Sequence, residues 1–201
     1  MFHLLKFKLD KSEKGQSFVE LSLVVVFLMI FVAGIIEFGF MLNNYLNMVD
    51  ASREAVRRSA NFDPFIVDPV TGTKSVDPNF YEETISFTED ILKPVVLDPS
   101  LGDDIVVTFF SVGVIGGNKV YDRYPNDDGW SAYGNQVSKL SDVEIQDRVD
   151  WTAPNTGVLL VEIFYNYPQV LKLPIFTAFV PDPMPVYVYA IMPLTAAEPE
   201  K

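Results

Sequence analysis

The sequence predicts an α+β protein in which a long N-terminal helix, apolar enough to span a membrane, precedes an antiparallel β-rich domain. Residues 18–42 form a nearly uninterrupted apolar stretch. Residues 43–60 contain neither Pro nor Gly, and small or apolar side chains recur among them at three- and four-residue spacing, which predicts that the helix continues. Beyond Phe62, short apolar runs rich in β-branched residues alternate with turn-forming segments, a pattern that indicates strands.

Length and composition limit the functions open to the chain. Its 201 residues suffice for one ordinary domain and an anchor. A net charge of -12 argues against nucleic-acid binding, which needs a surplus of Lys and Arg. There is no cysteine, and His3 is the only histidine. An enzyme would therefore be left with paired carboxylates or a Ser-Lys arrangement, and we expect no enzyme, no cofactor and no metal centre.

The apolar stretch has the length of a membrane span. From Phe18 to Leu42 a helix rising about 1.5 Å per residue covers about 36 Å, more than the roughly 30 Å of a hydrocarbon core. A buried core helix is one alternative, but the remaining domain is too small to enclose it. A cleavable secretory signal is another, but its apolar region would be about 7–15 residues long and followed by a small-x-small site. Residues 38–43 offer no such site.

The helix is expected to continue into the domain with a small, moderately apolar stripe that suits close packing against a sheet. This stripe comprises Tyr45, Met48, Val49, Ser52, Ala55, Val56 and Ser59. Glu54 and Arg58, four residues apart, are expected to pair. Four segments are expected: a basic leader at 1–15, a transmembrane helix at 16–42, its extension at 43–61 and an acidic α+β domain at 62–201.

Within the domain, turn and capping residues delimit the expected elements. Ser141 and Glu144 have the spacing of a capping box, which starts a short helix reaching about Val149. The remaining elements are a helix at 77–93, a strand at 104–114 turning through 116–118 into a hairpin at 119–121, and strands at 157–167 and 185–192.

A processing motif precedes the span. The segment Lys14-Gly15-Gln16-Ser17-Phe18-Val19-Glu20 is similar to the cleavage site of type IV-class prepilins. Gly15 has no side chain, so a peptidase can approach an extended backbone there. Glu20 is an ionisable residue at the start of a membrane helix, where charge is costly and usually functional. The alternative is that Glu20 merely lies in the headgroup layer beside a glycine of a flexible tail.

The stretch from Lys14 to Ser59 resembles the TadE-like family. That family combines a basic residue and Gly, a Val-Glu pair, an apolar run, a G-I-I-[DE]-F-G block and a tail rich in Ala and Arg. The chain supplies Lys14-Gly15, Val19-Glu20, the block at 34–39 and the tail at 51–57. It departs mildly from the pattern, with Glu37 in place of a common Asp and Phe40 where Arg is frequent.

The resemblance implies cleavage between Gly15 and Gln16 by an aspartate prepilin peptidase. It also implies that Glu20 meets the terminal amine of a neighbouring subunit and sets the axial register. The leader, with four lysines, would remain cytoplasmic, and the domain would lie outside a single-pass inner or plasma membrane protein. The expected partners are the membrane, the peptidase, other pilin subunits and the pilus assembly platform.

The function so implied is that of a minor pilin or pseudopilin, pilin-like in fold, in a tight-adherence pilus or secretion machine. The alternative is a permanently anchored extracytoplasmic protein that binds a ligand or the cell wall. The two differ at Gly15, because a permanent anchor keeps its leader.

Three weaker signals remain open. Glu37 lies 17 residues beyond Glu20, about 25 Å along the helix, and is either an interfacial anchor or an assembly contact. The acidic loop at 122–128 is either a calcium site or a solvated turn. The aromatic residues near it form either a recognition surface or a lid over the sheet; they are Tyr121, Tyr124, Trp130 and Tyr133.

Overall fold

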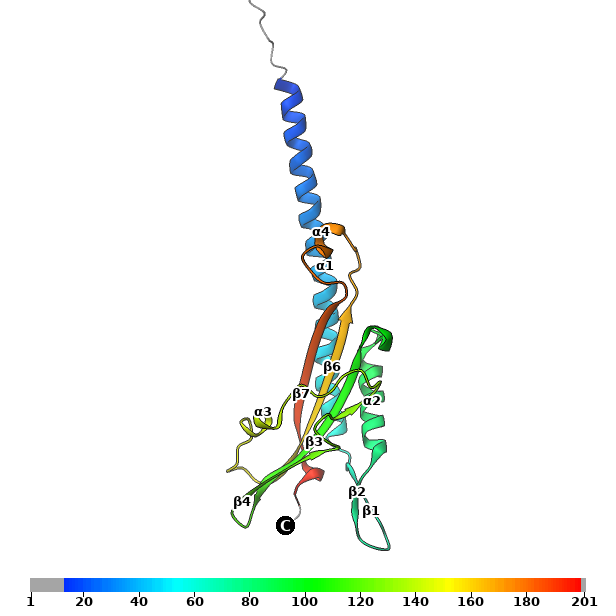
Figure 1. Cartoon of the computed structure of the whole chain (residues 1–201), viewed down its shortest axis with the longest axis vertical. Coiled ribbons are helices and arrows are strands. Elements are labelled where there is room, and N and C mark those ends of the chain that lie inside the picture. The colour runs from blue at the N-terminus through cyan, green and yellow to red at the C-terminus, as the bar shows by residue number, and fades with distance from the viewer. Residues whose placement is uncertain (1–12, 200–201) are drawn as a thin grey trace, which may run out of the picture.

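One helix runs through the length of the molecule. The computed structural model describes residues 13–199, and α1 extends from Glu13 to Ser59 without a break. Its N-terminal half projects from the domain, and its C-terminal half lies along the sheet (Figure 1). The expected α+β class, with one long helix and an antiparallel sheet, is confirmed.

The main sheet is antiparallel throughout, in the order β4-β3-β6-β7, with β5 pairing a different part of β3. The central strands β3 and β6 are buried along almost their whole length, because both of their faces are covered. The bounds are Asp104–Ile115 for β3, Asn118–Tyr124 for β4, Trp130–Ser131 for β5, Thr156–Tyr167 for β6 and Met184–Leu194 for β7.

Two helices cover one face of the sheet. The C-terminal half of α1 packs with α2 (Pro78–Leu92) against β3, β6 and β7. The expected stripe of α1 is mostly confirmed, since Met48, Ser52, Ala55 and Ser59 are fully buried; Tyr45, however, is 40% exposed. Small side chains let the helix approach the sheet closely. The core on this face also includes Phe80, Tyr81, Leu92, Ile105, Val107, Phe109, Leu159, Val161 and Ile163.

The opposite face carries a smaller core under α3 (Asp142–Gln146) and the segment before it. The capping box of Ser141 and Glu144 is confirmed, although α3 ends at Gln146 rather than near Val149. The residues buried here are Phe110, Val112, Leu140, Ile145 and Leu160.

Several short elements and one side-chain pair differ from the sequence prediction. The hairpin of β1 (Phe65–Val67) and β2 (Lys74–Val76), the helix α4 (Pro174–Thr177) and β5 were not predicted. They are two to four residues long, too short for hydrophobic periodicity to show. Glu54 pairs with Arg57 rather than with Arg58, whose guanidinium stacks on Phe87 at 3.8 Å from the ring centre.

A buried carboxylate fixes the segment that follows β5. Asp104, at the start of β3, has no solvent exposure. Its Oδ2 accepts hydrogen bonds from the Ser131 hydroxyl at 2.6 Å and from the amides of Asn135 and Gln136 at 2.8 Å, and its Oδ1 accepts one from the amide of Tyr133 at 3.1 Å. The segment has no strand partner here, so these bonds hold its backbone in place.

Asp104→Ala should destabilise the domain by about 3 kcal/mol or more, because it removes the fully buried acceptor of the bonds from the Ser131 hydroxyl and from three backbone amides. The measurement is urea-induced unfolding of the detergent-solubilised chain, followed by tryptophan fluorescence. Asp90→Ala is the control, since Asp90 forms only an exposed pair with Lys93 and its loss should cost about 0.5 kcal/mol or less. Equal effects of the two substitutions would contradict the role given to Asp104.

Candidate functional site

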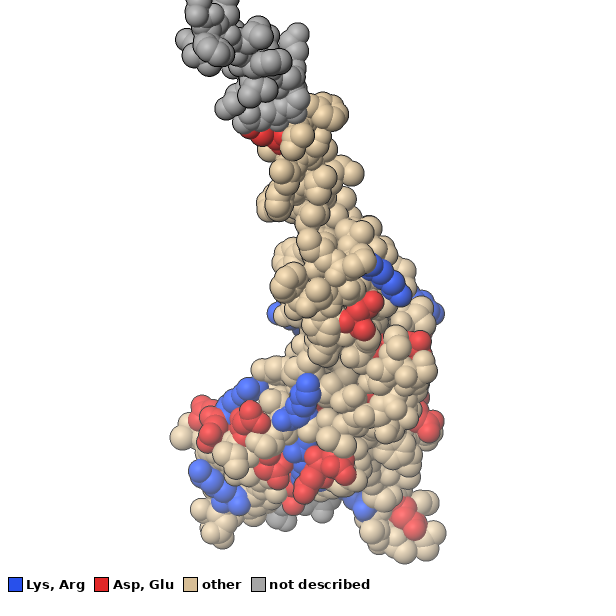
Figure 2. All heavy atoms as spheres, turned by 45° about the horizontal axis from the view of Figure 1, so that its top comes forward, with Lys and Arg blue, Asp and Glu red and all other residues tan. Residues whose placement is uncertain are grey.

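The projecting half of α1 exposes an apolar surface. In the part of the chain that the structure describes, it belongs to the one helix that is long and apolar enough to cross a membrane. None of the most apolar 18-residue stretch is buried against the rest of the chain, so the core-helix alternative is excluded. Figure 2 shows charged side chains gathered over the domain and few on the projecting helix. One N-terminal apolar helix suggests a single-pass membrane protein.

The predicted processing site lies at the start of this helix. Residues 1–12 of the predicted leader are outside the described residues, as is the side chain of Gln16. The backbone of both residues is within the first turn of α1, helical rather than extended. A peptidase that binds extended substrate would therefore have to unwind this turn. Glu20 lies on the exposed part of the helix, and its role in register remains a prediction.

Glu37, in contrast, is held by distant parts of its own chain. Its Oε1 accepts hydrogen bonds from the Tyr167 hydroxyl and the Val170 amide, and its Oε2 accepts one from the Leu171 amide, each at 2.8 Å. These donors lie at the end of β6 and in the segment that links β6 to β7. We call residues 168–183 of this segment the collar; it contains α4 and lies beside α1 (Figure 1).

The contact between Glu37 and the collar was missed by the sequence analysis, which weighed only a membrane anchor and an assembly contact. A signal was present, because an ionisable residue in an apolar helix needs a partner. That partner follows 130 residues later, however, and no local pattern connects the two. Both proposed roles of Glu37 remain predictions, to which the structure adds this intrachain one.

Tyr167 remains a hydrogen-bond donor at this site. Burial, together with its hydrogen bond to Glu37, raises the pKa of the Tyr167 hydroxyl above its ordinary value. The phenol therefore keeps its proton under all physiological conditions, and it can donate to the carboxylate throughout.

The collar also packs against α1 beside a glycine. A Cβ added to Gly34 would lie 3.2 Å from the ring of Phe176, so the absence of a side chain permits this close approach. Between the helix and the collar is an apolar cleft of about 340 Å³, lined by Phe38, Met41 and Val180 among others.

Hydrogen bonds join the two ends of the collar to each other. The side chain of Gln169 is 4% exposed and donates to the carbonyl oxygens of Val180 and Pro181, while its backbone amide donates to the Asp182 carboxylate at 3.0 Å. The collar is therefore a closed loop joined to α1 through Glu37, and the apolar helix and the collar together form the candidate site.

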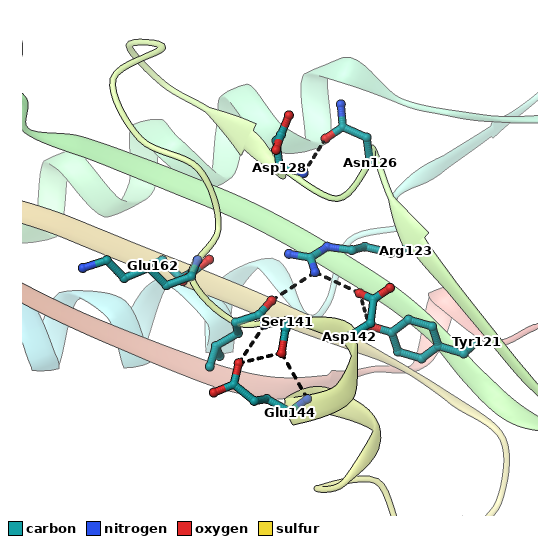
Figure 3. A network of polar contacts seen from close by, with 10 residues as sticks. Tyr121, Arg123, Asn126, Asp128, Ser141, Asp142, Glu144 and Glu162 are labelled. Atoms are coloured by element: carbon teal, nitrogen blue, oxygen red, sulfur yellow. Dashed lines mark hydrogen bonds and ion pairs between the residues drawn. The ribbon is translucent and has the colours of Figure 1, made fainter.

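A second polar network lies on the far side of the sheet and has a structural role. Arg123 of β4 donates to the Leu140 carbonyl at 3.0 Å and to Asp142 at 2.9 Å, and Tyr121 donates to the same carboxylate (Figure 3). These bonds tie α3 to the edge of the sheet. The side chain of Arg123 is 6% exposed, which makes it a supporting group rather than a surface contact.

The acidic loop at 122–128 has the bonding of a turn. Asn126 accepts a hydrogen bond from the Asp128 amide at 3.0 Å, and Asp122 belongs to β4. Among residues 13–199 there is no group of three or more acidic or histidine side chains placed to hold a metal ion. The calcium site and the solvated turn therefore both remain hypotheses for this loop.

The four aromatic residues near this loop do not form one cluster. They therefore make neither a single recognition surface nor a single lid over the sheet. Tyr124 and Trp130 stack on Phe109 and Tyr81, with ring centres 4.8 and 4.9 Å apart, and cover the helix side of the sheet as a lid would. Tyr121 packs on the opposite face and Tyr133 bonds to Glu89. Alternate residues of a strand face opposite sides, which separates them.

Glu37→Ala should release the collar from α1. Hydrogen bonds to a charged acceptor contribute about 1.5–3 kcal/mol each, so exchange of the Val170 and Leu171 amides should accelerate about tenfold or more. Hydrogen exchange of the full chain in detergent measures this. Glu54→Ala, which removes a carboxylate bonded to Arg57 on the same helix, should leave both amides unchanged. Unchanged exchange in Glu37→Ala would mean that the carboxylate does not hold the collar.

Comparison with known proteins gives one match. Residues 15–57 match the family model described as TadE-like protein. No curated protein and no solved structure matches the chain. The matched range ends within α1, so it covers the helix and leaves the β-rich domain without a counterpart. The TadE-like family implies a protein related to the tight-adherence pilus, and this chain is similar to that family over most of its N-terminal helix.

Proposed function

We propose that the chain is a minor pilin or pseudopilin of a tight-adherence pilus or secretion machine, matured by cleavage after Gly15 and assembled through α1. The observation that carries this proposal is that a single unbroken helix holds both the TadE-like match and the exposed apolar surface. The same helix is anchored in the core by its C-terminal half, at Met48 and Ala55.

This continuity is what a subunit that moves from membrane to fibre needs. In the bilayer, lipid covers the projecting apolar side chains. In a fibre, the corresponding helices of neighbouring subunits would cover them, so little apolar surface need meet water in either state. Because the helix is continuous with the core, movement of the helix carries the domain with it.

Glu20 gives such an assembly its register. Cleavage after Gly15 creates an amine at Gln16, and a carboxylate and an amine from adjacent subunits would pair at one axial stagger. In a partly desolvated site, an unpaired partner is costly, by about 3–5 kcal/mol when a buried pair is broken. Misaligned neighbours are therefore disfavoured, and the pair contributes specificity more than stability.

Gly15→Leu should block maturation, because a bulky side chain prevents the peptidase from reaching the backbone. Intact-mass measurement on protein extracted from cells with an active prepilin peptidase should find full-length chain for this variant and a chain starting at Gln16 for the native sequence. Gly39→Leu is the control, since a side chain there meets open space. A native protein that keeps its leader would instead support a permanently anchored binding protein.

Glu20→Ala should be matured normally but recovered poorly in the fibre or assembly-platform fraction, because it lacks the carboxylate that pairs with a neighbour. The measurement compares mature mass with the amount of subunit that cosediments with sheared fibres. Asp50→Ala removes an exposed carboxylate from the domain part of the same helix and should incorporate normally. Normal incorporation of Glu20→Ala would remove the register role.

A further inference from the structure

We propose that the collar, residues 168–183, is a second membrane-contacting element that inserts its apolar side chains into the leaflet nearest the domain. The inference depends on the membrane span of α1 and is independent of leader cleavage or fibre assembly. It concerns a part of the chain outside the range matched by the TadE-like family model.

The position of the collar along α1 places it at the level of the membrane. Phe176 contacts Gly34, which lies 16 residues beyond Phe18, or about 24 Å along the axis. A hydrocarbon core of roughly 30 Å that starts near Phe18 therefore extends past this contact. The surface of the collar is continuous with the lipid-facing surface of α1, through a groove lined by Phe31, Ile35 and Phe176.

Several exposed side chains of the collar are large and apolar. Phe179 is 83% exposed, Val170 57% and Ile175 44%, although elsewhere the domain has an acidic, charged surface. Residues 168–183 contain two charged side chains. Lys172 has a long stem that allows its ammonium group to reach the headgroups, and Asp182, at the end of the collar next to the domain, accepts the hydrogen bond of the Gln169 amide. Water is a poor solvent for such a surface. The membrane interface, in contrast, suits both the apolar side chains and the Lys172 ammonium group.

The backbone of the collar is also prepared for a medium that offers few hydrogen bonds. Of the sixteen residues of the collar, four are prolines without an N–H group, and the amides of eight others donate to acceptors within the chain. Two of these acceptors are the oxygens of Glu37. Irregular backbone is tolerated at membrane depth only when its polar groups are satisfied internally. A loop exposed only to water would not need these internal acceptors, because water could accept the hydrogen bonds of its amides.

Nitroxide scanning of the full chain in vesicles tests the insertion. Because the chain lacks cysteine, Phe179→Cys and Val170→Cys each give a single labelling site, and Val70→Cys gives the control. Val70 is 89% exposed, in the turn of the β1–β2 hairpin at the other end of the domain (Figure 1). The vesicles are phosphatidylcholine with phosphatidylglycerol, and accessibility is measured against dissolved oxygen and a water-soluble nickel chelate.

Labels at 179 and 170 should be several-fold less accessible to the nickel chelate than the label at 70, and more accessible to oxygen, at every protein-to-lipid ratio. Nickel accessibility equal to that at 70 would overturn the proposal. Protection that disappears when the protein is diluted in lipid would also overturn it, because the collar would then be covered by a second copy. A chain that fails to be cleaved or assembled leaves the outcome unaffected, since neither step is needed in vesicles.

Discussion

The structure depends on the packing of the C-terminal half of α1 against β6, β7 and α2. A helix of 47 residues exposes apolar side chains along its first half and would not hold a defined direction as an isolated segment. Burial of small side chains such as Ala51, Ser52 and Ala55 brings the helix close to the sheet and fixes that direction. The domain therefore fixes the direction of the helix, in addition to being attached to it.

Glu37 is the second point at which helix and domain are joined. A carboxylate in an apolar helix is costly unless it is paired, and here two backbone amides and a tyrosine hydroxyl satisfy it. Those amides belong to an irregular segment that would otherwise have to find acceptors elsewhere. The carboxylate and the collar thus satisfy each other, and the helix gains a rigid attachment next to the expected membrane boundary.

The domain itself uses buried carboxylates to organise irregular chain. Asp104 holds the segment after β5, and Asp103 accepts bonds from the amide and side chain of Asn166 near the end of β6. Both carboxylates are fully buried. Such bonds replace strand pairing where the sheet has none, and they fix the segment after β5 and the last residues of β6, just before the collar.

The sequence alone determined the long helix, its apolar half, the TadE-like motif with Gly15 and Glu20, the helix near 77–93 and the four long strands, because each depends on local periodicity, capping or turn residues. Only the tertiary structure decided the strand order, the separation of Tyr121 from Tyr124 on opposite faces and the closure of the collar on Glu37. These features join residues up to 134 positions apart. Their energies come from shared burial and paired hydrogen bonds, which no local stretch of sequence specifies.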